Sequence, residues 1–119
     1  MPVDTTQVKL SGATDGLPIL IAATTTAGTA VHTATASTTT TWDEVWLWAT
    51  NNHTAAVLLT IEFGGTSVGF QKISTIPAKA GETLVIPGFR VQNSAAIAAF
   101  AGTTNVIAIT GNVHRHVNS

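Results

Sequence analysis

The segment Glu44–Thr50 shows the alternation of side chains that is typical of a β-strand. Side chains along a strand point alternately to its two faces, so Val45 and Leu47 share one face while Trp46 and Trp48 share the other. Both of these faces are apolar, whereas a strand with one side in water carries polar residues on that side. The segment therefore predicts a strand that is covered on both sides, by the core and by a second surface.

Further short strands, separated by turn residues, are predicted along the rest of the chain. We expect them at Gln7–Leu10, Pro18–Ala23, Thr29–Thr35, Ala56–Phe63, Val68–Ile73, Glu82–Ile86, Phe89–Val91 and Asn105–Val113, the last extending through His116. The alanine-rich segment Ser94–Ala101 is compatible with a strand or with a helical turn. Short strands at intervals of roughly 8–12 residues are typical of sandwiches and barrels. The sequence predicts an all-β fold, a single-domain antiparallel β-sandwich or jelly-roll-like body of about eight short strands.

Three of these strands follow one another with only short turns between them. Asn51-Asn52-His53 follows the tryptophan-containing strand, and asparagine tolerates the left-handed backbone that tight turns need. Gly64-Gly65 is a hairpin signal before the third strand. The three strands therefore predict a meander, in which Glu44 and Glu62 could meet across neighbouring strands.

The composition agrees with a sheet protein that is covered by other protein. Nearly one residue in five is threonine, a β-branched residue that suits the pleated surface of a sheet. Only 9% of the residues are charged, against roughly 25% in an average soluble domain. With a mean hydropathy of +0.33, such a chain has little electrostatic protection against self-association. We expect a homo-oligomer.

The N-terminal residues lack a strong apolar face. We expect residues 1–16 to form a loose arm and residues 17–119 to form the β-sandwich domain. The polar N-terminal sequence does not have the form of a secretory signal peptide. The longest apolar run, Leu17–Ala23, is much shorter than the ~20 residues that cross a bilayer, so no membrane association is expected.

Charge and cysteine content exclude several classes of partner and site. The five lysines and arginines are scattered along the chain and form no basic run, so nucleic-acid binding is not expected. Cysteine is absent, which excludes disulfides, thiolate metal sites and cysteine nucleophiles.

The residues that could carry chemistry are few. His114 and His116 are two positions apart, so on a strand they share a face and could bind a transition metal; they could equally be exposed side chains near the chain end. Asp43 and Glu44 are adjacent and face opposite ways, so they cannot act together on one substrate. The nucleophile-elbow, P-loop and dinucleotide motifs are missing. We expect no enzymatic activity and no cofactor.

The tryptophans offer three interpretations. Trp42, Trp46 and Trp48 can pack into a core, anchor a protein interface, or stack on sugar rings. Leu58 lies on the face of its strand opposite Val57, so it too is available to a partner. The interface candidates are Trp46, Trp48 and Leu58.

Four stretches resemble the small structural proteins of tailed-bacteriophage virions. They are Ile76–Gly88, Val91–Asn93, Ala98–Phe100 and Asn105–Arg115, and the resemblance as a whole covers Glu44–His116. It implies a capsid decoration (cement) protein with a β-sandwich or jelly-roll-like body, often trimeric. Such a protein sits on the capsid surface of the virion, binds the major capsid protein and has no catalytic residues. Structural proteins of the phage tail share this style of sequence. The alternative is therefore a tail- or fibre-associated binding module, such as an adhesin or a carbohydrate-binding domain.

Overall fold

The chain folds into two antiparallel β-sheets packed face to face. The structure is a computed structural model that describes residues 3–79 and 81–118. Within that range the strands are β1 (Val3–Val8), β2 (Ile19–Leu20), β3 (Thr29–Thr33), β4 (Thr41–Asn51), β5 (Val57–Phe63), β6 (Gln71–Ile76), β7 (Thr83–Val91), β8 (Ala96–Ala101) and β9 (Ile107–Asn118), with one short 3-10 helix at Val68–Phe70. The antiparallel β-sandwich that the sequence predicts is confirmed.

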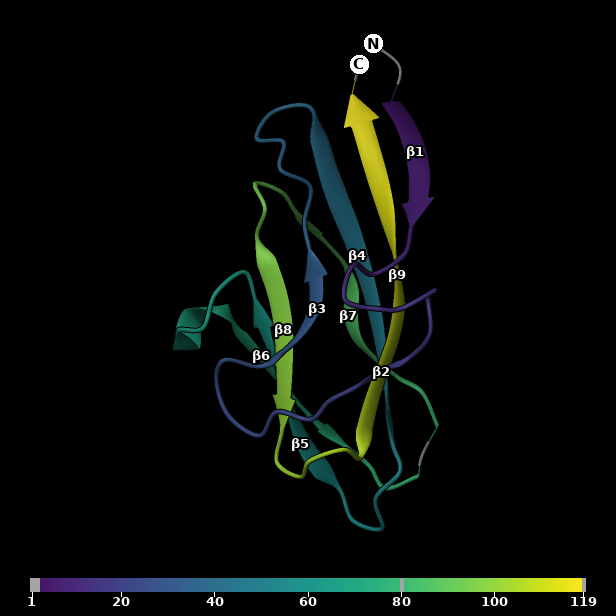
Figure 1. Cartoon of the computed structure of the whole chain (residues 1–119), viewed down its shortest axis with the longest axis vertical. Coiled ribbons are helices and arrows are strands. Elements are labelled where there is room, and N and C mark those ends of the chain that lie inside the picture. The colour runs from purple at the N-terminus through teal and green to yellow at the C-terminus, as the bar shows by residue number, and fades with distance from the viewer. Residues whose placement is uncertain (1–2, 80, 119) are drawn as a thin grey trace.

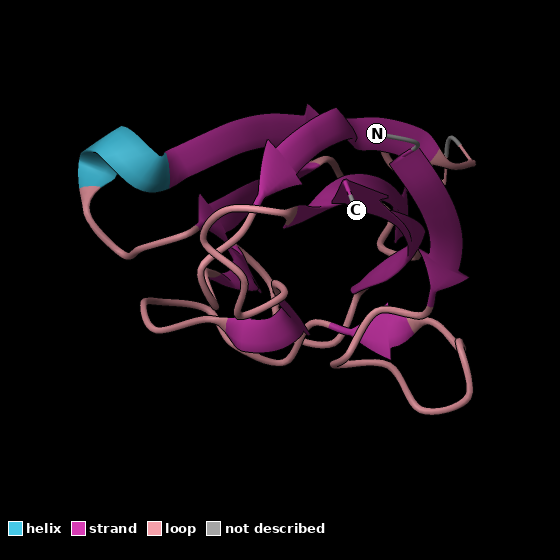
Figure 2. Cartoon of the chain, turned by 90° about the horizontal axis from the view of Figure 1, so that it is seen from above, coloured by secondary structure: helices cyan, strands magenta, loops and turns pink. Residues whose placement is uncertain are grey.

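The two sheets contain strands from both halves of the chain (Figure 1). The five-stranded sheet has the order β1-β9-β4-β7, and β2 also pairs with β9; the four-stranded sheet has the order β3-β8-β5-β6. In the view along the strands, the sheets enclose the core and the short helix projects to one side (Figure 2). No helix in the described part of the chain is long and apolar enough to cross a membrane.

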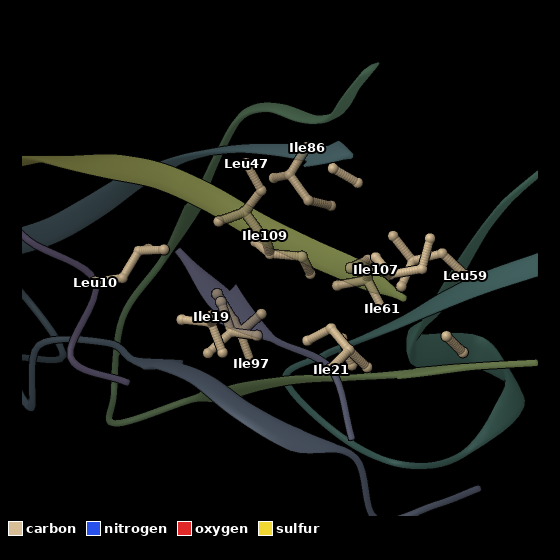
Figure 3. Packing of buried hydrophobic residues seen from close by; sticks show 14 of the residues in the cluster. Leu10, Ile19, Ile21, Leu47, Leu59, Ile61, Ile86, Ile97, Ile107 and Ile109 are labelled. Atoms are coloured by element: carbon tan, nitrogen blue, oxygen red, sulfur yellow. The ribbon is translucent and has the colours of Figure 1, made fainter. Parts of the chain in front are cut away.

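The core lies between the inner faces of the two sheets. Every second side chain of β4, from Asp43 to Asn51, is buried, as the alternation predicts. Ile107 of the five-stranded sheet lies beside Leu59 and Ile61 of the four-stranded sheet, and Leu47, Ile86 and Ile109 belong to the same buried cluster (Figure 3). Each such side chain contributes roughly 1.5–3 kcal/mol when it is fully buried.

The prediction of a loose N-terminal arm is wrong for the residues that the structure describes. Strand β1 is hydrogen-bonded to β9 along its whole length, from Val3 opposite Asn118 to Val8 opposite Val113. Its side chains are mostly exposed and polar, which is why the sequence shows no apolar pattern there. An edge strand is held by its backbone hydrogen bonds, so it does not need a buried face.

The predicted meander is wrong at its first turn, whereas the hairpin predicted at Gly64-Gly65 is confirmed by the pairing of β5 with β6. Strand β4 belongs to the five-stranded sheet, whereas β5 and β6 pair in the four-stranded sheet, so the chain crosses between the sheets after β4. The buried side chain of Asn51 holds this crossing. Its amide nitrogen donates to the carbonyl oxygens of Ala55 (3.0 Å) and Ile76 (2.9 Å), and its oxygen accepts from the backbone N–H of His53 (2.8 Å).

Three other expected elements differ in extent. The ambiguous alanine-rich segment contains a strand, β8. Strand β6 begins at Gln71 because Val68–Phe70 forms the 3-10 helix. The two strands expected on either side of Pro87-Gly88 are one strand, β7, whose pairing with β4 shifts register near this dipeptide. Such a bulge lets a strand continue through residues that break regular pairing.

Candidate functional site

One outer face of the sandwich carries all three tryptophans. On β4 the tryptophans alternate with buried residues, so their side chains point away from the core. We use the name tryptophan face for the outer surface formed by Trp42, Glu44, Trp46 and Trp48 of β4 with His114 and His116 of β9. All six side chains are partly buried. The core interpretation of the tryptophans is therefore wrong, because the core lies on the other side of β4.

Trp46 is fixed in place on this face. Its ring stacks on that of Trp48, with centroids 6.3 Å apart and planes 18° apart. Its Nε1 donates a hydrogen bond to Oε1 of Glu44 at 2.9 Å. The ring also lies so close to the backbone of Gly88 that an added Cβ there would be 2.7 Å from Cζ2 of Trp46. The pair presents a rigid apolar surface.

Trp42 stands beside a hollow at the other end of the face. His116 stacks on its ring from the β9 side, with centroids 5.6 Å apart and planes 13° apart. On the β7 side, Arg90 places its guanidinium carbon 6.0 Å from the ring centroid. Trp42, Arg90, Val91 and Gln92 line an open hollow of about 390 Å³ there.

Glu44 lies between the two histidines of β9. Its carboxylate oxygens are 3.4 Å from Nδ1 of His114 and 3.7 Å from Nε2 of His116. The hydrogen bond from Trp46, together with the charges of the histidines, holds the pKa of Glu44 below its usual value. No group of three or more histidine or acidic side chains in the described residues is arranged to hold a metal ion.

A buried ion cluster lies on the inner side of the same strands. The Asp43 carboxylate accepts from Nε and Nη2 of Arg115, at 2.7 and 3.1 Å. Nδ1 of His32 accepts from the backbone N–H of Ser11 (3.0 Å), so His32 carries its proton on Nε2 and donates it to Asp43 at 2.9 Å. Burial raises the pKa of Asp43, but the hydrogen bonds from Arg115 and His32 outweigh burial and hold that pKa below 3.8. The cluster joins β3, β4 and β9.

The sequence contains little that could have revealed this cluster. Its members come from positions 32, 43 and 115, which no local motif connects. The expectation that Asp43 and Glu44 face opposite ways is confirmed, since Asp43 is buried and Glu44 lies on the outer face. The inward orientation of Asp43 was the one sequence feature that pointed to this cluster, because a buried charge needs a partner.

The third interface candidate, Leu58, is on the opposite side of the molecule. It alternates with buried Val57 and Leu59 on β5 and therefore points outward from the four-stranded sheet. We use the name Leu58 face for the outer surface formed by Leu58, Ile73, Thr75, Ala98 and Phe100. None of these five residues is charged. One contact surface therefore cannot include Leu58 together with Trp46 and Trp48.

The expected meeting of Glu44 and Glu62 does not occur. They belong to different sheets, and Glu62 is buried beneath the loop before β3. Its carboxylate accepts from the hydroxyl of Thr26 and from the backbone N–H of Gly28, the latter at 2.7 Å. Glu62 thus holds a loop in place and does not pair with a second carboxylate.

Comparison with known proteins found no matching protein family, no similar curated protein and no similar solved structure. The buried ionic groups of this chain are held by hydrogen bonds within the fold. The two outer faces of the sandwich are therefore the features that can be matched to a function.

Proposed function

We propose that this protein is a non-enzymatic structural protein of a tailed-bacteriophage virion, a capsid decoration protein that binds the major capsid protein and stabilises the shell. The Leu58 face is the observation that carries the proposal. Leu58 is 51% exposed and Ile73 is 57% exposed, and they occupy diagonal positions on the neighbouring strands β5 and β6 of this face. Contiguous apolar surface of this kind marks contact with another protein.

The attachment depends on apolar burial. Covering apolar surface contributes about 25 cal/mol per Å² removed from water. A protein that binds only the assembled shell stabilises it by mass action, by ~2.7 kcal/mol at a hundredfold excess over Kd. Because salt screens charges and leaves apolar burial largely intact, this binding depends only weakly on salt concentration.

The test is to add the purified protein to undecorated phage heads and to measure occupancy and heat resistance across a salt series. The decisive variant is Leu58→Asp. Its matched control is Leu20→Asp, since Leu20 is 50% exposed but lies on β2 of the other sheet. We expect Leu58→Asp to lose at least tenfold in affinity and Leu20→Asp to bind normally. Equal binding of both variants, or no binding of the wild type, would contradict the proposal.

Self-association as a homotrimer is the second part of the proposal. The end of the tryptophan face at Trp46 and Trp48 is apolar, and the exposed Leu84 lies opposite Trp48 on β7. Packing these side chains against a second copy removes them from water. Light scattering at tens of micromolar should give three times the mass of the chain, and a monomer at that concentration would count against the trimer.

A tail- or fibre-associated binding module is the second candidate function. The hollow beside Trp42 supports it, because a partly exposed indole next to Arg90 and Gln92 combines a stacking surface with polar groups. If the chain binds a saccharide but no phage head, this candidate replaces the first.

A further inference from the structure

The hollow beside Trp42 has the features of a ligand site. His116 supports the indole from the β9 side, so the hollow side of the ring is presented in a fixed orientation. A binding group that is already ordered loses little entropy when it binds a ligand. The volume of about 390 Å³ lies within the 300–1,000 Å³ of small-molecule sites.

The hollow carries one formal charge, and it is positive. Arg90 is the charged residue among its four lining residues. Within residues 3–79 and 81–118, Arg90 makes no ion pair, whereas Arg115 is bound to Asp43. The neighbouring carboxylate of Glu44 is engaged by Trp46 and by the histidines of β9. The guanidinium of Arg90 lies over Trp42 and opposite Glu44, without an ion pair in that part of the chain, so it can turn toward an anionic ligand.

Gln92 adds a hydrogen-bonding group at the same place. Its Nε2 donates to the carbonyl oxygen of Thr38 at 2.8 Å, which fixes the side chain. Its Oε1 is left to accept a hydrogen bond. The hollow therefore combines a flat apolar surface, a cation and an oriented acceptor.

We propose that this hollow binds an acidic saccharide, a pyranose that carries a carboxylate. The C–H face of the sugar ring takes the place of the Arg90 guanidinium over Trp42, that guanidinium turns to donate hydrogen bonds to the carboxylate, and a ring hydroxyl donates to Gln92. This proposal rests on the second candidate function, for which it names the class of saccharide, and it uses the face opposite the Leu58 face. It does not depend on attachment to the shell.

Tryptophan emission gives a direct test, because the chain has three tryptophans, all on this face, and no tyrosine. The protein is titrated with a hyaluronan tetrasaccharide, which carries carboxylates, and with chitotetraose, which carries none. We expect a saturable emission change with both and about tenfold tighter binding of hyaluronan, the difference that a charge-assisted hydrogen bond supplies.

Three variants separate the contributions. Arg90→Gln should remove the preference for hyaluronan while leaving the weaker binding of chitotetraose. Trp42→Ala should abolish binding of both, and Trp42→Phe should restore part of it. Leu58→Asp is the matched control on the opposite face and should bind hyaluronan normally even where it no longer binds heads. Circular dichroism confirms that each variant is folded.

Three outcomes would overturn the proposal. The first is no emission change with either saccharide. The second is an unchanged preference for hyaluronan in Arg90→Gln. The third is competition by a short polyglutamate peptide as strong as that by hyaluronan, which would assign the hollow to an acidic peptide. Failure of head binding alone leaves this proposal standing, so the two proposals fail separately.

Discussion

Arg115 of β9 and Asp43 of β4 lie directly opposite each other and share two hydrogen bonds, of 2.7 and 3.1 Å. The carboxylate is fully buried, while the arginine side chain is 32% exposed. Buried carboxylates are costly without a partner, so this pair constrains which residues can occupy either position.

Replacing Arg115 by Met should destabilise the protein strongly. The variant leaves the buried carboxylate of Asp43 without its cation, which typically costs about 3–5 kcal/mol. Urea unfolding measures the change in the free energy of unfolding. Arg90→Met, at an exposed position, is the control and should change stability by less than ~0.5 kcal/mol. Equal effects of the two variants would show that the buried pair has no special role.

Asp43 should also make the stability depend on acid pH. Its pKa in the folded protein lies below 3.8, so the folded state binds fewer protons than the unfolded state in this range. The ionised Asp43 stabilises the fold above pH 3.8. This stabilisation is lost as the pH falls through the pKa that Asp43 has in the folded protein. Asp43→Asn should therefore be less stable than the wild type at neutral pH, and the gap should narrow below pH 3.8. Unfolding curves across the acid range check this, and a constant gap would contradict it.

Substitution of Gly88 by Ala should displace Trp46. The added Cβ would lie 2.7 Å from the indole, and the backbone at Gly88 has a φ of +81°. Gly81→Ala is a matched control, since Gly81 has a φ of +86° but no described atom within 4 Å of such a Cβ. Both variants lose about 1 kcal/mol from backbone strain, and Gly88→Ala should lose a further 1–3 kcal/mol from overpacking. Only Gly88→Ala should change the near-UV circular dichroism of the tryptophans.

Deleting residues 1–8 should weaken the five-stranded sheet without unfolding the domain. Strand β1 buries little, and each of its hydrogen bonds to β9 contributes about 0.5–1.5 kcal/mol. We expect a lower Tm and faster hydrogen exchange at the amides of β9 that pair with β1. Complete unfolding, or exchange rates identical to those of the full chain, would contradict this role for β1.

The regular strands could be predicted from the sequence, because inward and outward side chains alternate along a strand with a period of two residues. In β4 the burial follows the alternation of Val45, Leu47 and Ala49 with the two outward tryptophans. Strand β1 could not be predicted in its full extent, because an edge strand held by backbone bonds leaves no apolar pattern. The crossing between the sheets at Asn51 was also hidden, since a short polar turn fits a hairpin and a crossing equally well.

The candidate sites were predictable only as single residues. The sequence singled out Trp46, Trp48 and Leu58, and the structure separates them onto opposite outer faces. The hollow beside Trp42 depends on the register of β4 with β7, which places Arg90 opposite Glu44. Such cross-strand neighbours depend on long-range pairing, and no local spacing reveals them.

The pairing of β9 with β1, β2 and β4 has a consequence for the order in which the protein can fold. All three partners leave the ribosome before β9 does, and until then β4 has only β7 beside it in that sheet. The four-stranded sheet, by contrast, already has all its strands once β8 is made. The nascent chain thus leaves one edge of β4 without its backbone partner until β9 is made, which makes this interval the one in which a chaperone or a premature contact with another chain acts most strongly.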